Sequence, residues 1–280
     1  MKTLSSILLL AFFFTASAFA RDAVVQLATL YKGEDVKQYL ISEKYDGIRA
    51  VWKDGVLRTR SGNVIHAPSW FTQALPNVWL DGELWYQRGN FEYVASTVTK
   101  QIPVDEQWQN IRYMVFDAPD FSHTFEQRYA HYLLLVLQMN VSYIQAVKQF
   151  ELSDEEALQK VLREYEAKGA EGLMLHKANA MYRAGRSEQV LKLKSYHDRE
   201  AKVLKHQQGK GQYANKMGAL LVSYINKEGQ DIRFKIGTGF SLTERDSPPA
   251  VGSIITFRHY GFTKRGVPRF ASFIREHHAH

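Results

Sequence analysis

Residues 42–49 contain the residue types that a covalent phosphate-transfer site needs. They read Ser-Glu-Lys-Tyr-Asp-Gly-Ile-Arg, so Lys44 follows Glu43 and precedes an Asp-Gly pair and Arg49. A lysine amine serves as a nucleophile when its surroundings lower its proton affinity and bring phosphate to it. The same pattern is also typical of a charged strand end that leads into a hairpin. This segment alone does not decide between the two interpretations.

Five segments further along the chain carry residues of matching chemical kinds. Each has an ordinary structural explanation, because Asp-Gly pairs make turns, a strand phenylalanine is usually core, and alternating lysines line the wet side of a strand. In order, they are Arg60-Ser-Gly-Asn63, Asp81-Gly-Glu83, Phe116-Asp117, Glu171-Gly172 and Lys192-Leu-Lys194.

Together, the six segments resemble the nucleotidyl-transfer motifs of the covalent nucleotidyltransferase superfamily, which contains ATP-dependent DNA ligases, RNA ligases and capping enzymes. Tyr182 and residues 185–187 resemble the DNA-ligase approach to the lysine pair. Residues 209–211 and 216–221 resemble the opening of the ligase OB domain, and residues 266–270 its closing motif. The resemblance covers nearly the whole chain after its first residues, and it is to small exported bacterial ATP-dependent DNA ligases.

This resemblance implies an enzyme that seals 5′-phosphate/3′-hydroxyl nicks in duplex DNA through a lysyl-AMP intermediate and an adenylated DNA. ATP is the implied co-substrate, with Mg²⁺ or Mn²⁺, and nicked double-stranded DNA is the implied partner of a monomeric protein. An RNA ligase or a capping-type nucleotidyltransferase is the alternative within the same chemistry. A non-catalytic, basic DNA-binding protein is the alternative from another class.

The resemblance also implies a role for each motif. Lys44 is expected to be the nucleophile, with Lys192 and Lys194 binding phosphates beside it. Glu171 is expected to hold the divalent cation, since hard cations prefer oxygen ligands, and Phe116 to stack on adenine. The other residues expected to contact nucleotide are Glu43, Arg49, Arg60 and Glu83 (on the ribose hydroxyls); those expected to contact DNA are Arg186 (at the nick 5′-phosphate), Lys210, Lys216, Lys264, Arg265 and Arg269.

One part of the pattern departs from the larger ligases. Residues 264–269 read Lys-Arg-Gly-Val-Pro-Arg, where those ligases have an Arg-x-Asp/Lys-Lys pattern. The separate jobs of these cations are therefore not assigned by the resemblance. The basic segment at residues 202–216 suits contacts to backbone phosphates, with a solvated loop as the alternative.

Composition limits the possible classes of protein. The chain has 280 residues, of which 45% are hydrophobic and 23% charged, as in ordinary globular proteins. Its formal net charge of +7 suits a polyanionic partner such as nucleic acid. Because it contains no cysteine, disulfides, thiolate metal sites and cysteine nucleophiles are excluded.

The first twenty residues have the layout of a secretory signal peptide. Lys2 supplies the positive start, residues 7–14 form an apolar run, and Ala18-Phe19-Ala20 fits a small-x-small cleavage site. We therefore expect residues 1–20 to be a signal peptide that directs the protein to the periplasm. No later apolar run is long enough to span a bilayer, so no membrane association is expected after cleavage.

The element pattern predicts an α+β fold with two domains. An adenylation domain of antiparallel sheets and helices is expected at residues 21–195, followed by a small OB-fold β-barrel at residues 196–280. Residues 39–52 and 56–60 are expected to form a hairpin about a turn at residues 53–55, with Lys44 near the start of its first strand. A capping box at residues 153–156 is expected to open a helix that ends at Gly169. The other expected helices are 68–74 and 126–139, and the other expected strands are 78–86, 111–116, 143–147, 171–176, 190–194, 219–225, 231–236 and 253–260.

Overall fold

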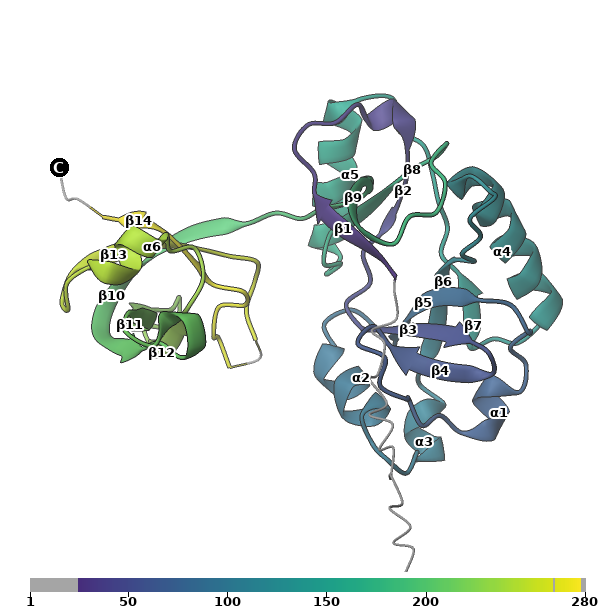
Figure 1. Ribbon diagram of the computed structural model, residues 1–280, viewed down its shortest axis with the longest axis horizontal. Helices are drawn as coiled ribbons and strands as arrows, with labels where there is room; N and C mark the ends of the chain where they lie inside the picture. The colour runs from purple at the N-terminus through teal and green to yellow at the C-terminus, as the bar shows by residue number, and fades with distance from the viewer. Residues whose placement is uncertain (1–24, 264, 278–280) are drawn as a thin grey trace, which may run out of the picture. The chain divides into compact units, whose positions relative to one another are not determined.

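The protein divides into two compact units, with the division between Lys192 and Leu193 (Figure 1). The computed structural model describes residues 25–263 and 265–277. The expected signal peptide therefore lies outside the described residues. Within the described ranges, no helix is long and apolar enough to cross a membrane.

The first unit is built on two β-sheets. A five-stranded sheet has the order β4-β3-β5-β6-β7, with antiparallel neighbours except for the parallel pair β6–β7. A four-stranded sheet has the order β1-β9-β8-β2. The strands are β1 Gln26–Leu30, β2 Tyr39–Glu43, β3 Ile48–Lys53, β4 Val56–Thr59, β5 Leu80–Trp85, β6 Arg112–Asp117, β7 Ile144–Ala146, β8 Leu173–Lys177 and β9 Gly185–Leu193.

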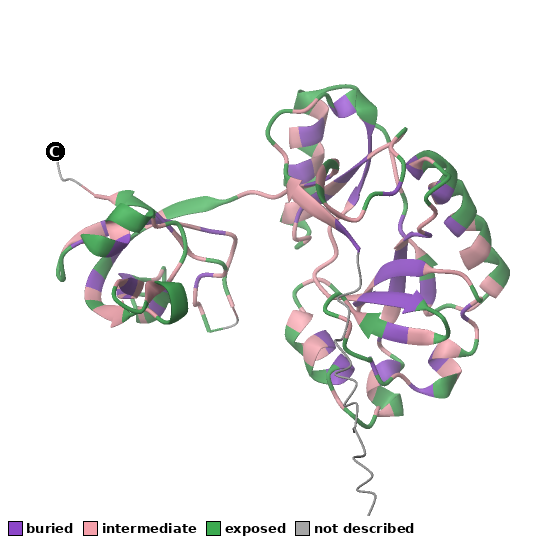
Figure 2. Ribbon diagram, viewed as in Figure 1, coloured by how far each residue is buried: buried purple, intermediate pink, exposed green. Residues whose placement is uncertain are grey.

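Helices complete the core over the five-stranded sheet. Phe71 of α1, Val94 of α2, Trp108 of α3 and Tyr132 of α4 all belong to one buried cluster with residues of β3, β5 and β6. The central strands of this sheet are accordingly buried in Figure 2. The helices are α1 Ser69–Thr72, α2 Phe91–Val98, α3 Asp105–Trp108, α4 Phe125–Met139 and α5 Glu155–Ala167, with a 3-10 turn η1 at Val36–Gln38.

Capping residues mark where the two longest helices, α4 and α5, begin and end. The Thr124 side chain and Gln127 form a capping box at the start of α4, and Asn140 ends the helix in the left-handed region at φ 49°. Asp154 caps α5 by accepting the backbone N–H of Ala157. The helix predicted from residues 153–168 is thus confirmed, but its capping residue is Asp154 alone and not a Ser/Glu box. Gly169 follows with φ +84°, as a C′ glycine should.

The prediction of one strand over residues 39–52 is wrong. The chain leaves β2 after Glu43 and enters β3 at Ile48, in the other sheet. The crossing requires Gly47, because a Cβ there would lie 2.1 Å from the carbonyl oxygen of Leu84. The hairpin itself is confirmed as β3–β4, with Asp54 and Gly55 both at positive φ in its turn. Lys44 consequently lies between the two sheets and not inside the hairpin.

The second unit contains one five-stranded antiparallel sheet of order β12-β11-β10-β13-β14. An isolated bridge between Thr238 and Ser272 links the region after β12 to β14, so the sheet curls towards the closed form of an OB fold without a continuous barrel ladder. Its elements are β10 His197–Gln208, η2 Gly211–Tyr213, β11 Met217–Ile225, β12 Asp231–Ile236, α6 Leu242–Asp246, β13 Ile254–His259 and β14 Ser272–Glu276.

Several elements escaped the sequence prediction. The largest is β10, because residues 202–208 belong to a strand and not to a solvated loop. Its alternating burial, with Ala201 and Val203 inside and Lys202 outside, is hidden in the sequence by the many charged outward positions. The strands β1 and β14 and the short helices α2, α3 and α6 were also not predicted.

Gly82 offers a direct test of packing between β5 and β6. A Cβ at this position would lie 2.6 Å from Tyr113 Cε2 and 2.7 Å from the Met114 carbonyl oxygen. We expect Gly82→Ala to lower the free energy of unfolding by about 3 kcal/mol or more, because buried backbone must shift. Gly55→Ala, at φ +72° in open space, should cost only about 1 kcal/mol.

Urea unfolding followed by tryptophan fluorescence measures both variants. All five tryptophans lie at or before Trp108, so the signal reports the first unit alone. Equal losses for the two variants would contradict the close packing at Gly82.

Candidate active site

A cavity of about 930 Å³ opens in the first unit, lined by residues from both of its sheets. Strands β2, β8 and β9 contribute from the four-stranded sheet, and β3, β5 and β6 from the five-stranded sheet. The lining includes Glu43, Lys44, Arg49, Arg60, Glu83, Phe116, Arg186 and Lys192. Tertiary structure thus brings most of the residues singled out in the sequence to one place.

Lys44 is held at the point where the chain crosses between the sheets. Its backbone N–H donates to the carbonyl oxygen of Gly172 at 2.9 Å. Its ammonium group forms an ion pair with the carboxylate of Glu171, and both side chains are largely buried. The crossing therefore presents one amine to the cavity and holds it against a carboxylate from the segment before β8.

Glu83 on β5 is the second carboxylate near this amine. Burial raises the pKa of Glu83 to about 8, although the positive charges of Lys44 and Arg49 act in the opposite direction. The neighbouring carboxylate of Glu171 adds to the upward shift. Near neutral pH, the Glu83 carboxyl consequently holds a proton. A cation that binds beside it would displace that proton.

Arg49 lies along the cavity wall under a tight constraint. It donates two hydrogen bonds to Asp81, with Nε–Oδ1 2.9 Å and Nη2–Oδ2 2.6 Å, and a third to the Gln26 carbonyl at 2.7 Å. Its guanidinium carbon also lies 5.3 Å from the ring centroid of Phe116. Although burial alone would lower its pKa, the carboxylate of Asp81 raises it. Two of the five guanidinium N–H groups remain for a ligand.

A second arginine–aspartate pair stands beside the first. Asp117 faces Asp81 across the β5–β6 ladder, and Arg128 of α4 donates to Asp117 through Nε at 2.7 Å and Nη2 at 3.1 Å. Both Asp117 and Arg128 are about 2% exposed. Burial raises the pKa of Asp117, and Arg128 opposes that shift. This pair ties α4 to the strand that carries Phe116.

His176 of β8 is a neutral side chain at the cavity wall. Its ring stacks on Phe125 with centroids 4.3 Å apart, and a second aromatic ring, Phe116, lies 6.5 Å away. Burial lowers the pKa of His176 to about 3, and the positive charge of Arg128 lowers it further. Its Nδ1 is buried and has no hydrogen-bond partner among the described residues. The aromatic and aliphatic part of the cavity, which Met174 also lines, is therefore uncharged.

Two predicted nucleotide contacts are placed differently from the rest. The Glu43 carboxylate is held by Arg88 through two hydrogen bonds of 2.8 Å, so this side chain serves the local structure. Lys194 belongs to the second unit, where its ammonium lies 4.3 Å from the ring centroid of Tyr260 and 4.8 Å from that of Phe270. The lysine motif is thus divided between the units, with Lys192 at the cavity.

The predicted DNA contacts of the second unit lie on its loops and edges. Lys210 and Arg265 are exposed, whereas Lys216 forms an ion pair with Asp246 of α6. Lys264 lies outside the described residues. Arg245 donates to the carbonyls of Met217 and Gly218 in β11 and of Gly237 after β12, and its guanidinium carbon lies 4.3 Å from the ring centroid of Tyr213 in the loop after β10. The remaining predicted DNA contacts are Arg186, an exposed lining residue of the first unit's cavity, and Arg269, which is half-buried.

Several residues that line the cavity have no role predicted from the sequence. Asp81 and Asp117 lay inside quoted motifs, so their position was visible, but their arginine partners were not. Met174 and His176 follow the Glu171-Gly172 motif at alternate positions of a strand, which is a signal that they share a face. Nothing in the sequence marked Arg88.

The carboxylates offer only part of a metal site. Among residues 25–263 and 265–277, no group of three or more His, Asp or Glu side chains is arranged to hold a metal ion. Glu171 and Glu83 are close enough for the charge of one to raise the pKa of the other, and both carry the hard oxygens that Mg²⁺ or Mn²⁺ prefers. This pair fits a cation whose other ligands are water and phosphate oxygens.

The shifted pKa of Glu83 has a measurable effect on stability. Between the carboxylate's ordinary pKa and about 8, the folded protein holds a proton that the unfolded chain has lost, so the free energy of unfolding falls as pH rises through this window. Through Glu83, the wild type should lose on the order of 2–4 kcal/mol of its free energy of unfolding between pH 5 and pH 8. The Glu83→Gln variant should not show this loss. Urea unfolding of the first unit at both pH values measures it.

The control for this experiment is Glu92→Gln, which replaces an exposed carboxylate on α2. It should keep the wild-type pH dependence. If Glu83→Gln keeps it as well, Glu83 is ionised in the folded protein and our description of its surroundings is wrong.

Two family models match the chain. The ATP dependent DNA ligase domain matches residues 23–194, and the DNA ligase OB-like domain matches residues 208–276. The first covers more than half of the sequence and contains the entire cavity described above.

Individual relatives agree with the family models. A DNA ligase of Haemophilus influenzae is 38% identical over 268 residues, covering 96% of this chain and 97% of that protein. A solved structure from work on Lig E DNA ligases is 44% identical, with a TM-score of 0.85, and the match covers 90% of this chain and 98% of that one. The Chlorella virus DNA ligase-adenylate, at 24% identity and a TM-score of 0.51 over 92% of this chain and all of that one, shares the fold. The chain therefore belongs to the ATP-dependent DNA ligase family, with an adenylation domain followed by an OB-like domain.

Proposed function

We propose that Lys44 is the nucleophile through which this ATP-dependent DNA ligase takes AMP from ATP. The observation that carries the proposal is the placement of its amine, which is fixed by the bond from its backbone N–H to Gly172 and held at the cavity by Glu171. The resemblance of residues 44–49 to the lysine motif supports the same assignment. Residues 21–195 then act as the adenylation domain and residues 196–280 as the OB domain.

The reaction has three phosphoryl-transfer steps. The Lys44 amine attacks the α-phosphorus of ATP, a P–N bond forms, and pyrophosphate leaves. An oxygen of the nick 5′-phosphate then attacks the same phosphorus, and the P–N bond breaks to leave adenylated DNA. Finally, the 3′-hydroxyl attacks the 5′-phosphorus and AMP departs as the strand is sealed. Positioning and charge neutralisation supply most of the rate in such chemistry.

Because Lys44 forms an ion pair, its amine must be deprotonated before the first reaction step. An ammonium bound to a carboxylate has no free electron pair, so Lys44 must give up a proton before it attacks. Glu171 lies within hydrogen-bond reach to receive that proton. Lys192, which lines the same cavity, would hold phosphate oxygens and disfavour the charged amine.

A divalent cation is part of the proposal. Glu171 would hold Mg²⁺ or Mn²⁺ together with Glu83, which takes this role in place of the ribose contact that the resemblance implied. The cation would neutralise phosphate charge when bound. The raised pKa of Glu83 is consistent with this role, because its proton would leave as positive charge arrives.

The rest of the cavity orients the nucleotide. Phe116 offers a ring for adenine, and the neutral His176 and Met174 line the same uncharged region. Arg49, fixed by Asp81, presents its two remaining N–H groups to phosphate, and Arg60 is an exposed cation on the rim. Glu43 is assigned to support of the loop through Arg88 and not to a direct side-chain contact.

DNA binding is assigned to basic residues of both units. Arg186 would bind the nick 5′-phosphate, while Lys210, Lys216, Lys264, Arg265 and Arg269 would contact backbone phosphates from the OB domain. Lys194 is assigned to phosphate binding, as the lysine motif implies. We propose that the protein acts as a monomer.

The nucleophile is tested by intact-mass measurement after incubation with ATP and Mg²⁺. The wild type should gain one AMP and seal a nicked duplex, while Lys44→Ala should gain none and lose sealing by at least about 10³-fold, since it lacks the attacking atom. Lys32→Ala, an exposed lysine outside the cavity, is the control. Labelling of the Lys44→Ala variant to the wild-type extent would refute the assignment, and preference for GTP or RNA nicks would redirect it to the capping or RNA ligase classes.

We also propose that the protein is exported to the periplasm. The support is the signal-peptide pattern of residues 1–20, with its small residues at Ala18 and Ala20. Cell fractionation followed by N-terminal sequencing should recover a periplasmic form that begins at Arg21, and Ala20→Leu should leave the chain uncleaved. A full-length protein that stays in the cytoplasm would contradict export while leaving the catalytic proposal intact.

A further inference from the structure

A second cavity, of about 500 Å³, lies in the first unit between the end of β8 and the start of β9. Its charged lining comprises Lys177, Arg183, Arg186 and a single acidic residue, Glu188. Uncharged hydrogen-bonding groups come from Asn179, Ser187 and Gln189. Three positive charges therefore face one negative charge, with hydroxyl and amide groups among them.

The positively charged side chains of this cavity have few partners within the described part of the protein. Neither the Lys177 nor the Arg183 side chain makes an ion pair or hydrogen bond with any other residue in the described part of the chain. Arg186 donates one hydrogen bond, through Nη1 to the Ala28 carbonyl at 3.3 Å. This differs from the catalytic cavity, where Arg49 and Lys44 are each held by a carboxylate. Positive charge gathered without a protein partner indicates an anionic ligand.

The composition of the lining narrows the ligand to phosphate. Arginine, lysine, serine hydroxyl and side-chain amide groups are the usual donors to phosphate oxygens. No aromatic side chain lines the cavity, so it offers no surface on which a nucleobase could stack. The lining therefore suits a phosphate group and not the base of a nucleotide.

The position of the cavity indicates which phosphate it would hold. Arg186 lines both this cavity and the catalytic one, so the two adjoin through a single side chain. If Arg186 binds the nick 5′-phosphate, as we propose above, a DNA strand continuing from that phosphate must place its following phosphates nearby. The second cavity is a basic site that adjoins Arg186 within the first unit.

We propose that the cavity formed by Lys177, Arg183 and Arg186 binds a backbone phosphate of the strand that carries the nick 5′-phosphate, one or two nucleotides beyond the nick. This proposal rests on the proposed function for the role of Arg186 alone. Through this site the adenylation domain binds DNA directly. The contact also positions the 5′-phosphate relative to Lys44. The same chemistry would also accept free pyrophosphate, and the experiment separates the two.

The test compares the double variant Lys177→Ala/Arg183→Ala with Lys160→Ala/Arg163→Ala, which removes the same charges from exposed positions of α5 outside both cavities. Binding is measured to a nicked duplex with a 3′-dideoxy end, over a series of salt concentrations. The cavity variant should bind about tenfold more weakly at low salt, and the slope of log affinity against log salt should fall by about 1 to 2. The α5 variant should retain the wild-type slope.

Methylphosphonate substitution then locates the contact. Nicked duplexes are made with one uncharged phosphonate at each successive position beyond the nick phosphate. At one of the first two positions, the phosphonate should weaken wild-type binding several-fold and leave binding by the cavity variant unchanged, as a double-mutant cycle requires for a direct contact. Equal sensitivity of the wild type and the variant at every position would overturn the proposal.

Two further readouts keep the outcomes distinct. Self-adenylation by ATP, which needs no DNA, reports whether the variant is folded; if the alanine variant fails it, Lys177→Gln/Arg183→Gln replaces it in the same measurements. A wild type that never adenylates would refute the proposed function and not this site. If the cavity variant is impaired only in pyrophosphate-driven release of AMP, the cavity binds pyrophosphate and our assignment to DNA is wrong.

Discussion

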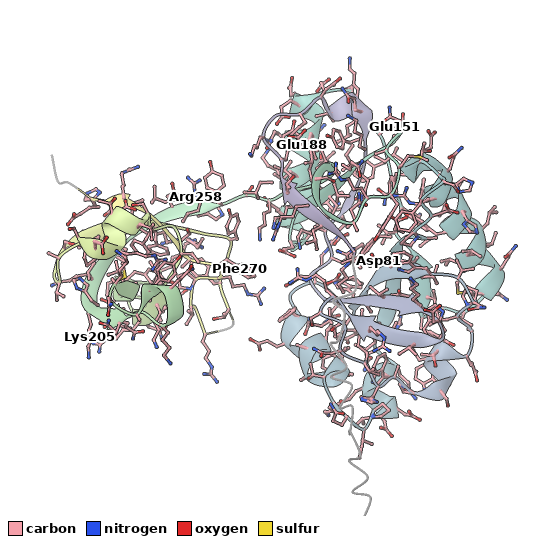
Figure 3. All side chains as sticks on the ribbon, viewed as in Figure 1. Asp81, Glu151, Glu188, Lys205, Arg258 and Phe270 are labelled. Carbon is pink, nitrogen blue, oxygen red and sulfur yellow. The ribbon has the colours of Figure 1, made fainter. Side chains whose placement is uncertain are left out.

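Two buried carboxylates, Asp81 (labelled in Figure 3) and Asp117, face each other on adjacent strands of the central sheet, and each must be neutralised. Arg49 and Arg128 do so through bidentate pairs. Removing either partner would leave a buried charge uncompensated, at a cost of about 3–5 kcal/mol. Because Arg49 is on β3 and Arg128 on α4, the two pairs lock three strands and a helix together. The wall of the nucleotide cavity depends on this arrangement.

The position of the Lys44 amine depends on a different feature, the crossing of the chain from one sheet to the other. A lysine within a strand would point to one face of one sheet, whereas Lys44 is placed where residues of both sheets converge. Gly47 permits this crossing because the Leu84 carbonyl leaves no room for a side chain. The carboxylates of Glu171 and Glu83 then come from strands or loops of opposite sheets. Lys44 thus lies at the boundary between the two sheets, which hold it in a fixed position.

The two units handle positive charge in opposite ways. In the first, Lys44 and Arg49 are held by the carboxylates of Glu171 and Asp81, which lowers the repulsion between the two cations. In the second, Arg245 is used for structure, since it ties α6 to the carbonyls of β11 and of Gly237 after β12, and lies against the Tyr213 ring of the loop that carries Lys210. Arg265 is also exposed, as is Lys205, which Figure 3 labels. The positive charge of the chain is therefore divided between the cavity, the folding of the second unit and the surface.

The sequence by itself determined the chemistry and most of the regular elements. The order of the motifs predicted the superfamily, and local patterns predicted α4, α5, β5, β6 and most strands of the second unit, because caps and side-chain alternation are local properties. Only the tertiary structure decided how Lys44 is presented, that Arg49 is clamped by Asp81, that Glu43 serves Arg88, and that Lys177 and Arg183 share a cavity with Arg186. The ion pairs join residues that are distant in sequence, and no local pattern encodes which distant partner neutralises a buried charge. Lys177, Arg183 and Arg186 are close in sequence, but only the fold of the segment between β8 and β9 places them around one cavity.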